Sequence, residues 1–220
     1  MGDSHTLPVA SCGSIAMNKI KQMFHISKIY LKFIVNRTSG YLRMYLRFIM
    51  NIVLNIYFFL TNRDIRISLS CKIYKNAVLD TPHGGAIRLG KNVQIHPYAM
   101  LLTYGGNIYI GENSGINPYC MIYGHGNLSI GESVKIAAHT IVIPANHIYE
   151  KKDILISEQG MSAKGIVIEK DVWIGAGSKL LDGIKIGKGC VIGAGSVVTK
   201  NTEPYGVYVG VPATKISERN

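Results

Sequence analysis

The stretch Ile168–Lys200, IEKDVWIGAGSKLLDGIKIGKGCVIGAGSVVTK, repeats a pattern six residues long. Every sixth position holds a large aliphatic residue, the next position is often glycine, and the fourth after the aliphatic is mostly small or β-branched. A fixed period of this kind predicts stacked repeats, because one short unit buries its apolar face only against its neighbours. The aliphatic positions are Ile168, Ile174, Leu180, Ile186, Ile192 and Val198.

The same frame runs back to Ile67 with regular interruptions. Three hexads make one triangular coil, in which each hexad supplies a short strand and a corner. In the four interrupted coils the third hexad is lengthened by 4, 3, 2 and 20 residues. Since every insertion falls in the third hexad, all insertions are expected to leave the structure at one corner. Residues 67–204 are therefore predicted to form an all-β parallel helix of about six coils.

The composition fits this architecture and excludes other classes of protein. Of 220 residues, 31 are isoleucine and 15 are valine, and such β-branched side chains pack well on pleated surfaces. With 47% apolar and 17% charged residues, the chain is not intrinsically disordered. The four cysteines form no C-x-x-C pair, so neither a disulfide framework nor a zinc finger is expected, and a reducing compartment is the default.

The net charge of +11 is concentrated in residues 17–66, which lack the hexad. Between Met17 and Arg63 there are eight cationic residues and no acidic residue. We predict a basic, apolar helical arm here, with helices over Lys19–Val35 and Tyr41–Leu60 separated by a break at NRTSG.

The arm has two interpretations. Its uncharged run Phe48–Asn62 is short for a membrane span, which needs about 20 apolar residues. Residues 17–62 are expected either to lie on an anionic membrane surface or to pack on the β-helix or on a neighbouring subunit. Outside these segments, residues 1–16 lack a signal-peptide core and are assigned to a leader, and residues 205–220 to a C-terminal tail.

The longest insertion, residues 148–165, begins just after His147. Functional residues concentrate on loops that a rigid scaffold holds in place. A histidine at this junction can titrate near neutral pH and take a proton from a hydroxyl group. Carboxylates that could orient it are Glu150, Asp153 and Glu158.

Several motifs together resemble the hexapeptide-repeat acyltransferases, over residues 67–216. The resemblance extends to the acetyl-CoA-dependent sugar O-acetyltransferases, including the maltose/galactoside enzymes and those that decorate bacterial capsule and O-antigen. It implies that the β-helix is left-handed. The motifs are ANH before the long loop, EQG within it (Glu158–Gly160), DVWIGAG (Asp171–Gly177), IGAGSVVTK (Ile192–Lys200) and GVPA (Gly210–Ala213).

The resemblance also implies roles for individual residues. His147 matches the general base, Asn117 an acceptor-side asparagine, and Ala176 the residue whose backbone N–H faces the thioester carbonyl. Trp173 matches an aromatic residue near the acyl donor, contributed across a subunit interface. Ala194 lies one coil of 18 residues beyond Ala176, so small side chains stack at one corner and leave a groove. The implied coenzyme-binding residues are Trp173, Gly175, Ala176, Gly193, Ala194, Thr199, Lys200 and Lys215.

These roles imply an enzyme that transfers an acetyl group from acetyl-CoA to a hydroxyl of a saccharide. The implied assembly is a cytoplasmic homotrimer with active sites between subunits, with peripheral contact at the inner face of the membrane through residues 17–62. No metal requirement and no nucleic-acid partner are expected. The acceptor sugar and its hydroxyl stay open.

Three alternatives are weighed against this function. The first is N-acetylation of an amino-sugar nucleotide on the same scaffold. The second is a metalloenzyme of the γ-carbonic-anhydrase type, which needs three clustered histidines, of which His139 and His147 are the candidates. The third is a binding module without catalysis, which gives no reason for the ANH motif, the loop and Trp173 to occur together.

Overall fold

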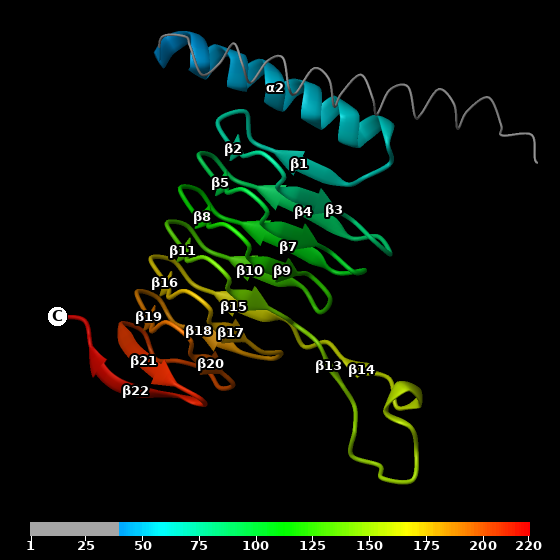
Figure 1. Cartoon of the computed structure of the whole chain (residues 1–220), viewed down its shortest axis with the longest axis vertical. Coiled ribbons are helices and arrows are strands. Elements are labelled where there is room, and N and C mark those ends of the chain that lie inside the picture. The colour runs from blue at the N-terminus through cyan, green and yellow to red at the C-terminus, as the bar shows by residue number, and fades with distance from the viewer. Residues whose placement is uncertain (1–39) are drawn as a thin grey trace, which may run out of the picture. The chain divides into compact units, whose positions relative to one another are not determined.

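The computed structural model describes residues 40–220. The chain winds into a solenoid of about six turns, in which strands of successive turns pair into three sheets (Figure 1). The all-β coiled architecture is confirmed, and each sheet is one side of the triangular coil. The expected helix Lys19–Val35 and the leader 1–16 lie outside the described residues.

The strands fall into three sheets, named here A, B and C. Sheet A contains β1 (Ile65–Ile67), β4 (Ala86–Leu89), β7 (Asn107–Ile110), β10 (Leu128–Ile130), β15 (Ile166–Ile168) and β18 (Lys185–Ile186). Sheet B contains β2 (Lys72–Ile73), β5 (Gln94–Ile95), β8 (Gly115–Ile116), β11 (Lys135–Ile136), β16 (Trp173–Ile174), β19 (Val191–Ile192), β21 (Gly206–Gly210) and β22 (Ala213–Glu218). Sheet C contains β3 (Val78–Asp80), β6 (Met100–Leu102), β9 (Met121–Tyr123), β12 (Ile141–Val142), β17 (Lys179–Leu180) and β20 (Val197–Val198).

The aliphatic residues of the hexad form the core, coil on coil. In sheet B, Ile136 pairs with Ile116 on one side and Ile174 on the other, and all three are fully buried. The fourth position after the aliphatic is also buried and small, as at Ser114 and Cys120. Burial raises the pKa of the Cys120 thiol to about 11, so it stays protonated as an apolar filler.

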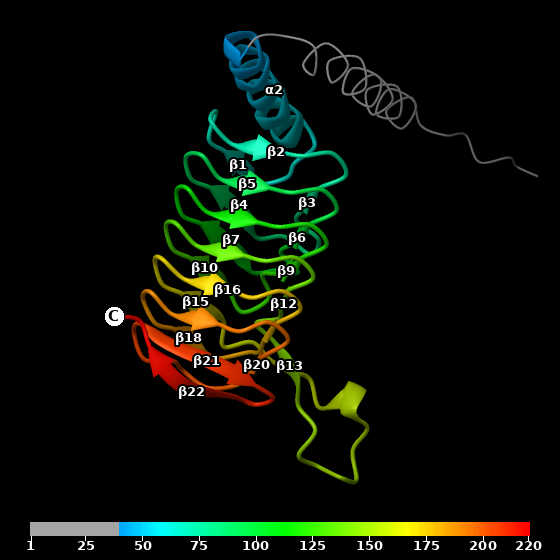
Figure 2. The ribbon, with the colours of Figure 1, turned by 60° about the vertical axis from the view of Figure 1, so that its left-hand side comes forward.

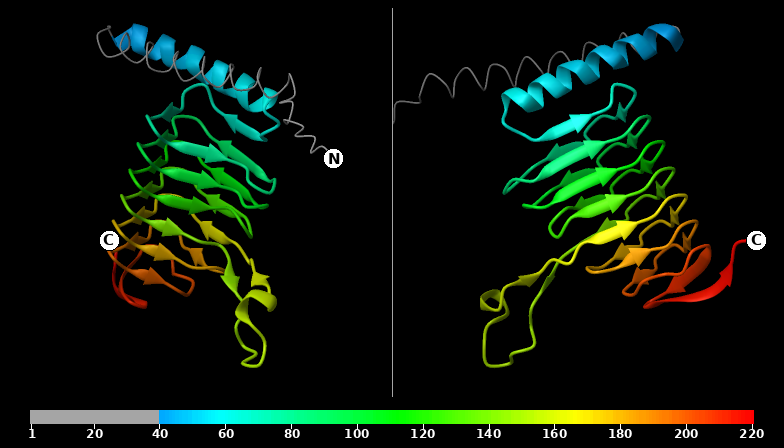
Figure 3. Two further views of the ribbon diagram at one scale, coloured as in Figure 1. Left: turned by 45° about the vertical axis from the view of Figure 1, so that its right-hand side comes forward. Right: turned by 180° about the vertical axis from the view of Figure 1, so that it is seen from behind.

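The corners of the solenoid are named by the sheets that they join (Figure 2). The BC corner includes residues 96–99, 117–120, 137–140, 175–178 and 193–196, and the CA corner includes residues 81–85, 103–106, 124–127, 143–165 and 199–200. All four insertions of the third hexad emerge at the CA corner, as predicted. The longest forms the projecting arm, which extends away from the solenoid and is a different segment from the N-terminal helical arm (Figure 3).

The helix α2 (Gly40–Leu60) confirms the prediction for Tyr41–Leu60. The chain divides into two compact units between Arg47 and Phe48, so the helix from Phe48 onward belongs to the unit of the solenoid. There, Leu54 and Phe58 are buried, and Asn51 Nδ2 donates to the carbonyl oxygens of Leu69 and Cys71 at 2.9 Å each. This part of α2 therefore caps the first coil, whose backbone groups would otherwise lack partners.

The C-terminal residues assigned to a tail contain two strands. β21 continues sheet B in parallel to β19, and β22 folds back antiparallel to β21. The hexad ends before these strands, so its period carried no signal for this hairpin.

Candidate active site

The BC corner carries a column of backbone N–H groups that the solenoid does not use. Pro97 and Pro118 occupy the second corner position on two coils, and proline has no N–H to donate. Ala138, Ala176 and Ala194 occupy the same position on the next three coils. Within residues 40–220, the Ala176 and Ala194 N–H groups donate to no other residue. The fold therefore leaves these N–H groups available to an acceptor oxygen.

Beside these groups, glycines keep the corner open. A Cβ added at Gly177 or Gly195 would meet no atom within 4 Å. Position 175 requires glycine for a different reason, because a Cβ there would lie 2.5 Å from the backbone nitrogen of Ala194 on the next coil. Gly177 and Gly195 thus leave free space along the corner, as a thin ligand arm running parallel to the solenoid axis requires.

Two predicted residues lie next to this column. Asn117 donates from Nδ2 to the Ile136 carbonyl at 2.9 Å, and its Oδ1 has no partner among the described residues. Trp173 stands on the outer side of sheet B, 57% exposed, and pairs with Lys135 and Val191. Neither side chain is needed for the core, since Asn117 is half-buried and Trp173 is exposed.

The CA corner carries His147. It lies on β13 (Asn146–His147), which pairs antiparallel with β14 (Met161–Ser162) in the projecting arm, and the short helix η1 (Ile156–Glu158) lies on the returning side of this arm (Figure 3). His147 is exposed, and no carboxylate of the described chain contacts it. The three carboxylates considered from the sequence therefore have no visible role in orienting it.

Asp182, which sequence reasoning missed, ties the returning end of the arm to the solenoid. Its carboxylate accepts hydrogen bonds from Ser162 Oγ at 2.9 Å, Lys164 N at 2.8 Å and Gly165 N at 2.9 Å. Ser162 pairs with Asn146, the neighbour of His147. In the sequence, the only signal for this role is that Asp182 follows Lys164 by 18 residues, the length of one coil.

The structure separates the predicted residues into two groups. Asn117, Trp173 and the glycine–alanine column belong to sheet B and the BC corner, whereas His147 lies at the CA corner. Thr199 and Lys200, expected to bind the coenzyme together with Ala194, also lie at the CA corner. One chain therefore does not bring the histidine to the open groove. Sheet C lies between the two corners.

Lys215, the predicted phosphate partner, is already paired. Its ammonium group binds Glu203 at 2.6 Å and also Glu218. Hydrogen bonds to Glu203 and then to Glu218 raise the pKa of Lys215. A phosphate group would have to replace these carboxylates.

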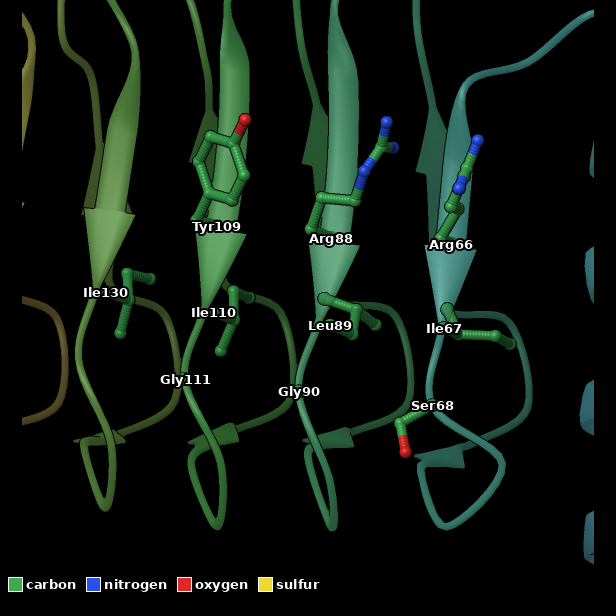
Figure 4. A pocket seen from close by; sticks show the side chains of 10 residues that line it. All are labelled: Arg66, Ile67, Ser68, Arg88, Leu89, Gly90, Tyr109, Ile110, Gly111 and Ile130. Carbon is green, nitrogen blue, oxygen red and sulfur yellow. The ribbon is translucent and has the colours of Figure 1, made fainter.

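A groove without these residues lies on the outer side of sheet A (Figure 4). It has a volume of about 490 Å³ and is shallow. Arg66, Arg88 and Tyr109 stand along it on successive strands, and Arg88 is bound to Asp64 through contacts of 2.6 and 2.7 Å. It contains none of the residues predicted for catalysis.

The metalloenzyme alternative finds no support in residues 40–220. No three His, Cys, Asp or Glu side chains in this range are grouped so that they could hold a metal ion. His139 lies at the BC corner and His147 at the CA corner.

Comparisons with known proteins agree with the fold and the repeat. A family described as "Bacterial transferase hexapeptide (six repeats)" matches residues 165–200. A search of the curated proteins found no matching sequence.

Two kinds of solved structure are similar to the chain. A maltose O-acetyltransferase from Clostridium difficile 630 is 33% identical, with a TM-score of 0.54, over 60% of this chain and 68% of that chain. AntD, an N-acyltransferase from Bacillus cereus, is 28% identical over 71% of this chain and 82% of that chain. The TM-score is 0.56 for an AntD mutant in complex with dTDP-4-amino-4,6-dideoxyglucose and coenzyme A. It is 0.55 for AntD with dTDP and 3-hydroxybutyryl-CoA.

The solenoid, the hexad and these similarities define the class of protein. The chain belongs to the hexapeptide-repeat acyltransferases. Its relatives include both an O-acetyltransferase and an N-acyltransferase, so membership in the family leaves the acceptor atom undecided.

Proposed function

We propose that the protein transfers an acetyl group from acetyl-CoA to a hydroxyl of a saccharide, in a site completed between two copies of the chain. The observation that carries the proposal is the column of unused N–H groups at Ala176 and Ala194 beside the open positions Gly177 and Gly195. Such a column offers a hydrogen-bond donor for an oxyanion and room for a pantetheine arm.

Sheet C supports the assembly. Its outward positions are apolar on most coils, whereas the equivalent positions of sheet A include Arg66, Arg88 and Lys185. The two corners that hold the site residues are the two edges of this sheet. A threefold ring that buries sheet C brings the BC corner of one copy to the CA corner of the next. The apolar outward positions of sheet C are Val78, Met100, Met121, Ile141 and Val197.

In this arrangement His147 of one copy lies at the BC corner of its neighbour, level with His139 and next to the coil of Ala176. The histidine takes the proton of the acceptor hydroxyl as its oxygen attacks the thioester carbonyl carbon. The Ala176 N–H donates to the carbonyl oxygen, which becomes negatively charged. The carbon–sulfur bond then breaks, and the proton passes from His147 to the departing thiolate. Coenzyme A leaves as the thiol, and the histidine is neutral again.

N-acylation of an amino-sugar nucleotide is the second candidate, because AntD, an N-acyltransferase, is similar over most of this chain. The same groups would serve, with the acceptor amine in place of the hydroxyl. The products differ chemically, since an ester is cleaved by mild base and an amide is not.

The test is coenzyme A release with neutral saccharides and with dTDP-4-amino-4,6-dideoxyglucose, followed by base treatment of the acetylated product. We expect a base-labile product. In the His147→Ala variant, kcat should fall by about 10²-fold or more, the scale of a lost general base. The matched control is Lys152→Ala, an exposed residue of the same arm. A base-stable product would favour the amine acceptor, and near-normal turnover by His147→Ala would remove the histidine from the mechanism.

A further inference from the structure

A column of aromatic rings continues the BC corner toward the N-terminal coils. Tyr98 and Tyr119 stack with ring centroids 5.1 Å apart and planes within 1°. Tyr119 and His139 stack at 5.1 Å and 6°. The column ends there, because Gly177 takes the same position on the next coil. The aromatic part of the corner thus meets the open part between His139 and Gly177.

The fold does not require these rings. Tyr98, Tyr119 and His139 have φ values of +62°, +61° and +60°, a conformation that costs about 1 kcal/mol or more for residues other than glycine. Glycine fills the position on the coils of Gly177 and Gly195. The two tyrosines are 47% and 51% exposed, and their hydroxyls bond to no other described residue. The turn itself requires this conformation, since Asn76, Gly177 and Gly195 share it on other coils, so only the choice of bulky rings in place of glycine or asparagine calls for an explanation.

A second group of rings lies at the CA corner, on the coils that precede His147. Tyr104 stacks on His125 at 4.8 Å and meets Tyr123 edge-on at 5.1 Å. His125 Nδ1 is buried and has no hydrogen-bond partner in the described chain. Burial lowers the pKa of His125, and nearby His83 lowers it further, so the ring is neutral at pH 7 and Nδ1 or Nε2 can accept a hydrogen bond. An unsatisfied buried nitrogen costs free energy unless a ligand pairs with it.

Both groups are uncharged. The BC segments 96–99, 117–120 and 137–140 contain no Asp, Glu, Lys or Arg. Neither do the CA segments 81–85, 103–106 and 124–127, which Tyr123 joins from the end of β9. Burial lowers the pKa of His96, and the charges of Lys135 and Lys72 lower it further, but both lysines stand on sheet B, outside the two groups. A diphosphate would find no cation on these segments, whereas sugar hydroxyls would find tyrosine, histidine and asparagine side chains.

In a threefold ring, equal coils of neighbouring copies lie at equal heights. Tyr98 of one copy then faces Tyr104 of the next, and Tyr119 faces Tyr123 and His125. His139 lies level with His147. We infer that these two walls form the acceptor subsite, and that the acceptor is a neutral saccharide of at least two sugar rings. The inference rests on the proposed function and specifies its substrate class. Its reason is that the walls extend over three coils and lead to the end of the groove where the thioester would lie.

The test is a glycan array of neutral and charged saccharides, probed with the wild-type protein and two variants. Tyr119→Gly should fold, since glycine occupies this position on later coils, and Tyr119→Phe removes only the hydroxyl. We expect neutral oligosaccharides to bind the wild type, with at least tenfold weaker binding for Tyr119→Gly and a smaller loss for Tyr119→Phe. Tyr109→Ala, an equally exposed tyrosine on sheet A, is the matched control and should bind normally.

Titration with acetyl-CoA on the same proteins separates the two proposals. All variants should bind acetyl-CoA with unchanged Kd. Three results would overturn the acceptor subsite alone, provided that acetyl-CoA still binds. They are no binding of neutral glycans, binding of charged glycans only, and equal glycan binding by Tyr119→Gly and the wild type. Loss of acetyl-CoA binding in the wild type overturns the proposed function itself.

Discussion

At the scale of single residues, the proposed chemistry depends on one corner position whose backbone N–H the solenoid leaves unused. Pro97 and Pro118 show that the fold accepts a residue without an N–H there. Ala176 keeps the N–H and places it beside the space at Gly177. The occurrence of proline and alanine at equivalent positions thus separates what the fold needs from what the proposed reaction would use.

This equivalence allows a substitution that removes one hydrogen-bond donor. Ala176→Pro should fold, because the same corner carries proline on two earlier coils. Its kcat should fall by about 10²–10³-fold, the cost of losing one oxyanion donor, in a coenzyme A release assay. Ala176→Gly keeps the N–H and serves as the control, with kcat close to wild type. Equal kcat for the two variants would show that this N–H is not the donor.

At the scale of elements, α2 has two different faces. Asn51 and Asn55 face the first coil, where Asn55 exchanges two hydrogen bonds with the backbone of Ile67 at 2.9 and 3.0 Å. Ile56 and Phe59 are 51% and 81% exposed. By length and composition alone, α2 could cross a membrane, but asparagines that bind the first coil are not available to lie within a bilayer. The asparagines that interrupt its apolar sequence are thus part of the cap.

We propose that the exposed face of α2 contacts anionic lipid at the inner leaflet, aided by the cations between Met17 and Arg63. Phe59→Ser should reduce flotation with anionic vesicles at low salt and leave the Tm unchanged. Asn51→Ala should lower the Tm and leave flotation unchanged, since unpaired carbonyls on the first coil cost about 1–3 kcal/mol of stability. Each variant is the control for the other. No flotation of the wild type at low salt would leave α2 as a cap only.

At the scale of the whole molecule, the candidate site is incomplete in one chain. His147 and Ala176 lie on the two edges of sheet C, and its outward residues are mostly apolar. In the proposed assembly, association through sheet C both covers this face and completes the site. Activity and assembly are therefore expected to be lost together.

Met121→Glu places a charge on the outer side of sheet C, on the coil of Asn117. We expect this variant to sediment as a monomer and to lose acetyl transfer, while its circular dichroism stays that of the wild type. Ser129→Glu, at the equivalent hexad position of sheet A, is the matched control and should remain trimeric and active. A fully active monomer, from either variant or the wild type, would contradict a site shared between copies.

The sequence by itself determined the solenoid, since its rules are local and repeat every six residues. Large aliphatics at Ile116, Ile136 and Ile174 had to stack, and insertions confined to the third hexad had to emerge at one corner. The same period placed Ala176 and Ala194 on one column. Only the tertiary structure decided what the non-repeating parts do: that Asn51 and Asn55 cap the first coil, that Asp182 holds the base of the arm, that residues 206–218 form a hairpin, and that Lys215 is already paired. These contacts join residues distant in sequence and follow no period, so they become visible only when the chain is folded. The separation of His147 from Ala176 has the same origin, because it depends on which corner each hexad reaches in space.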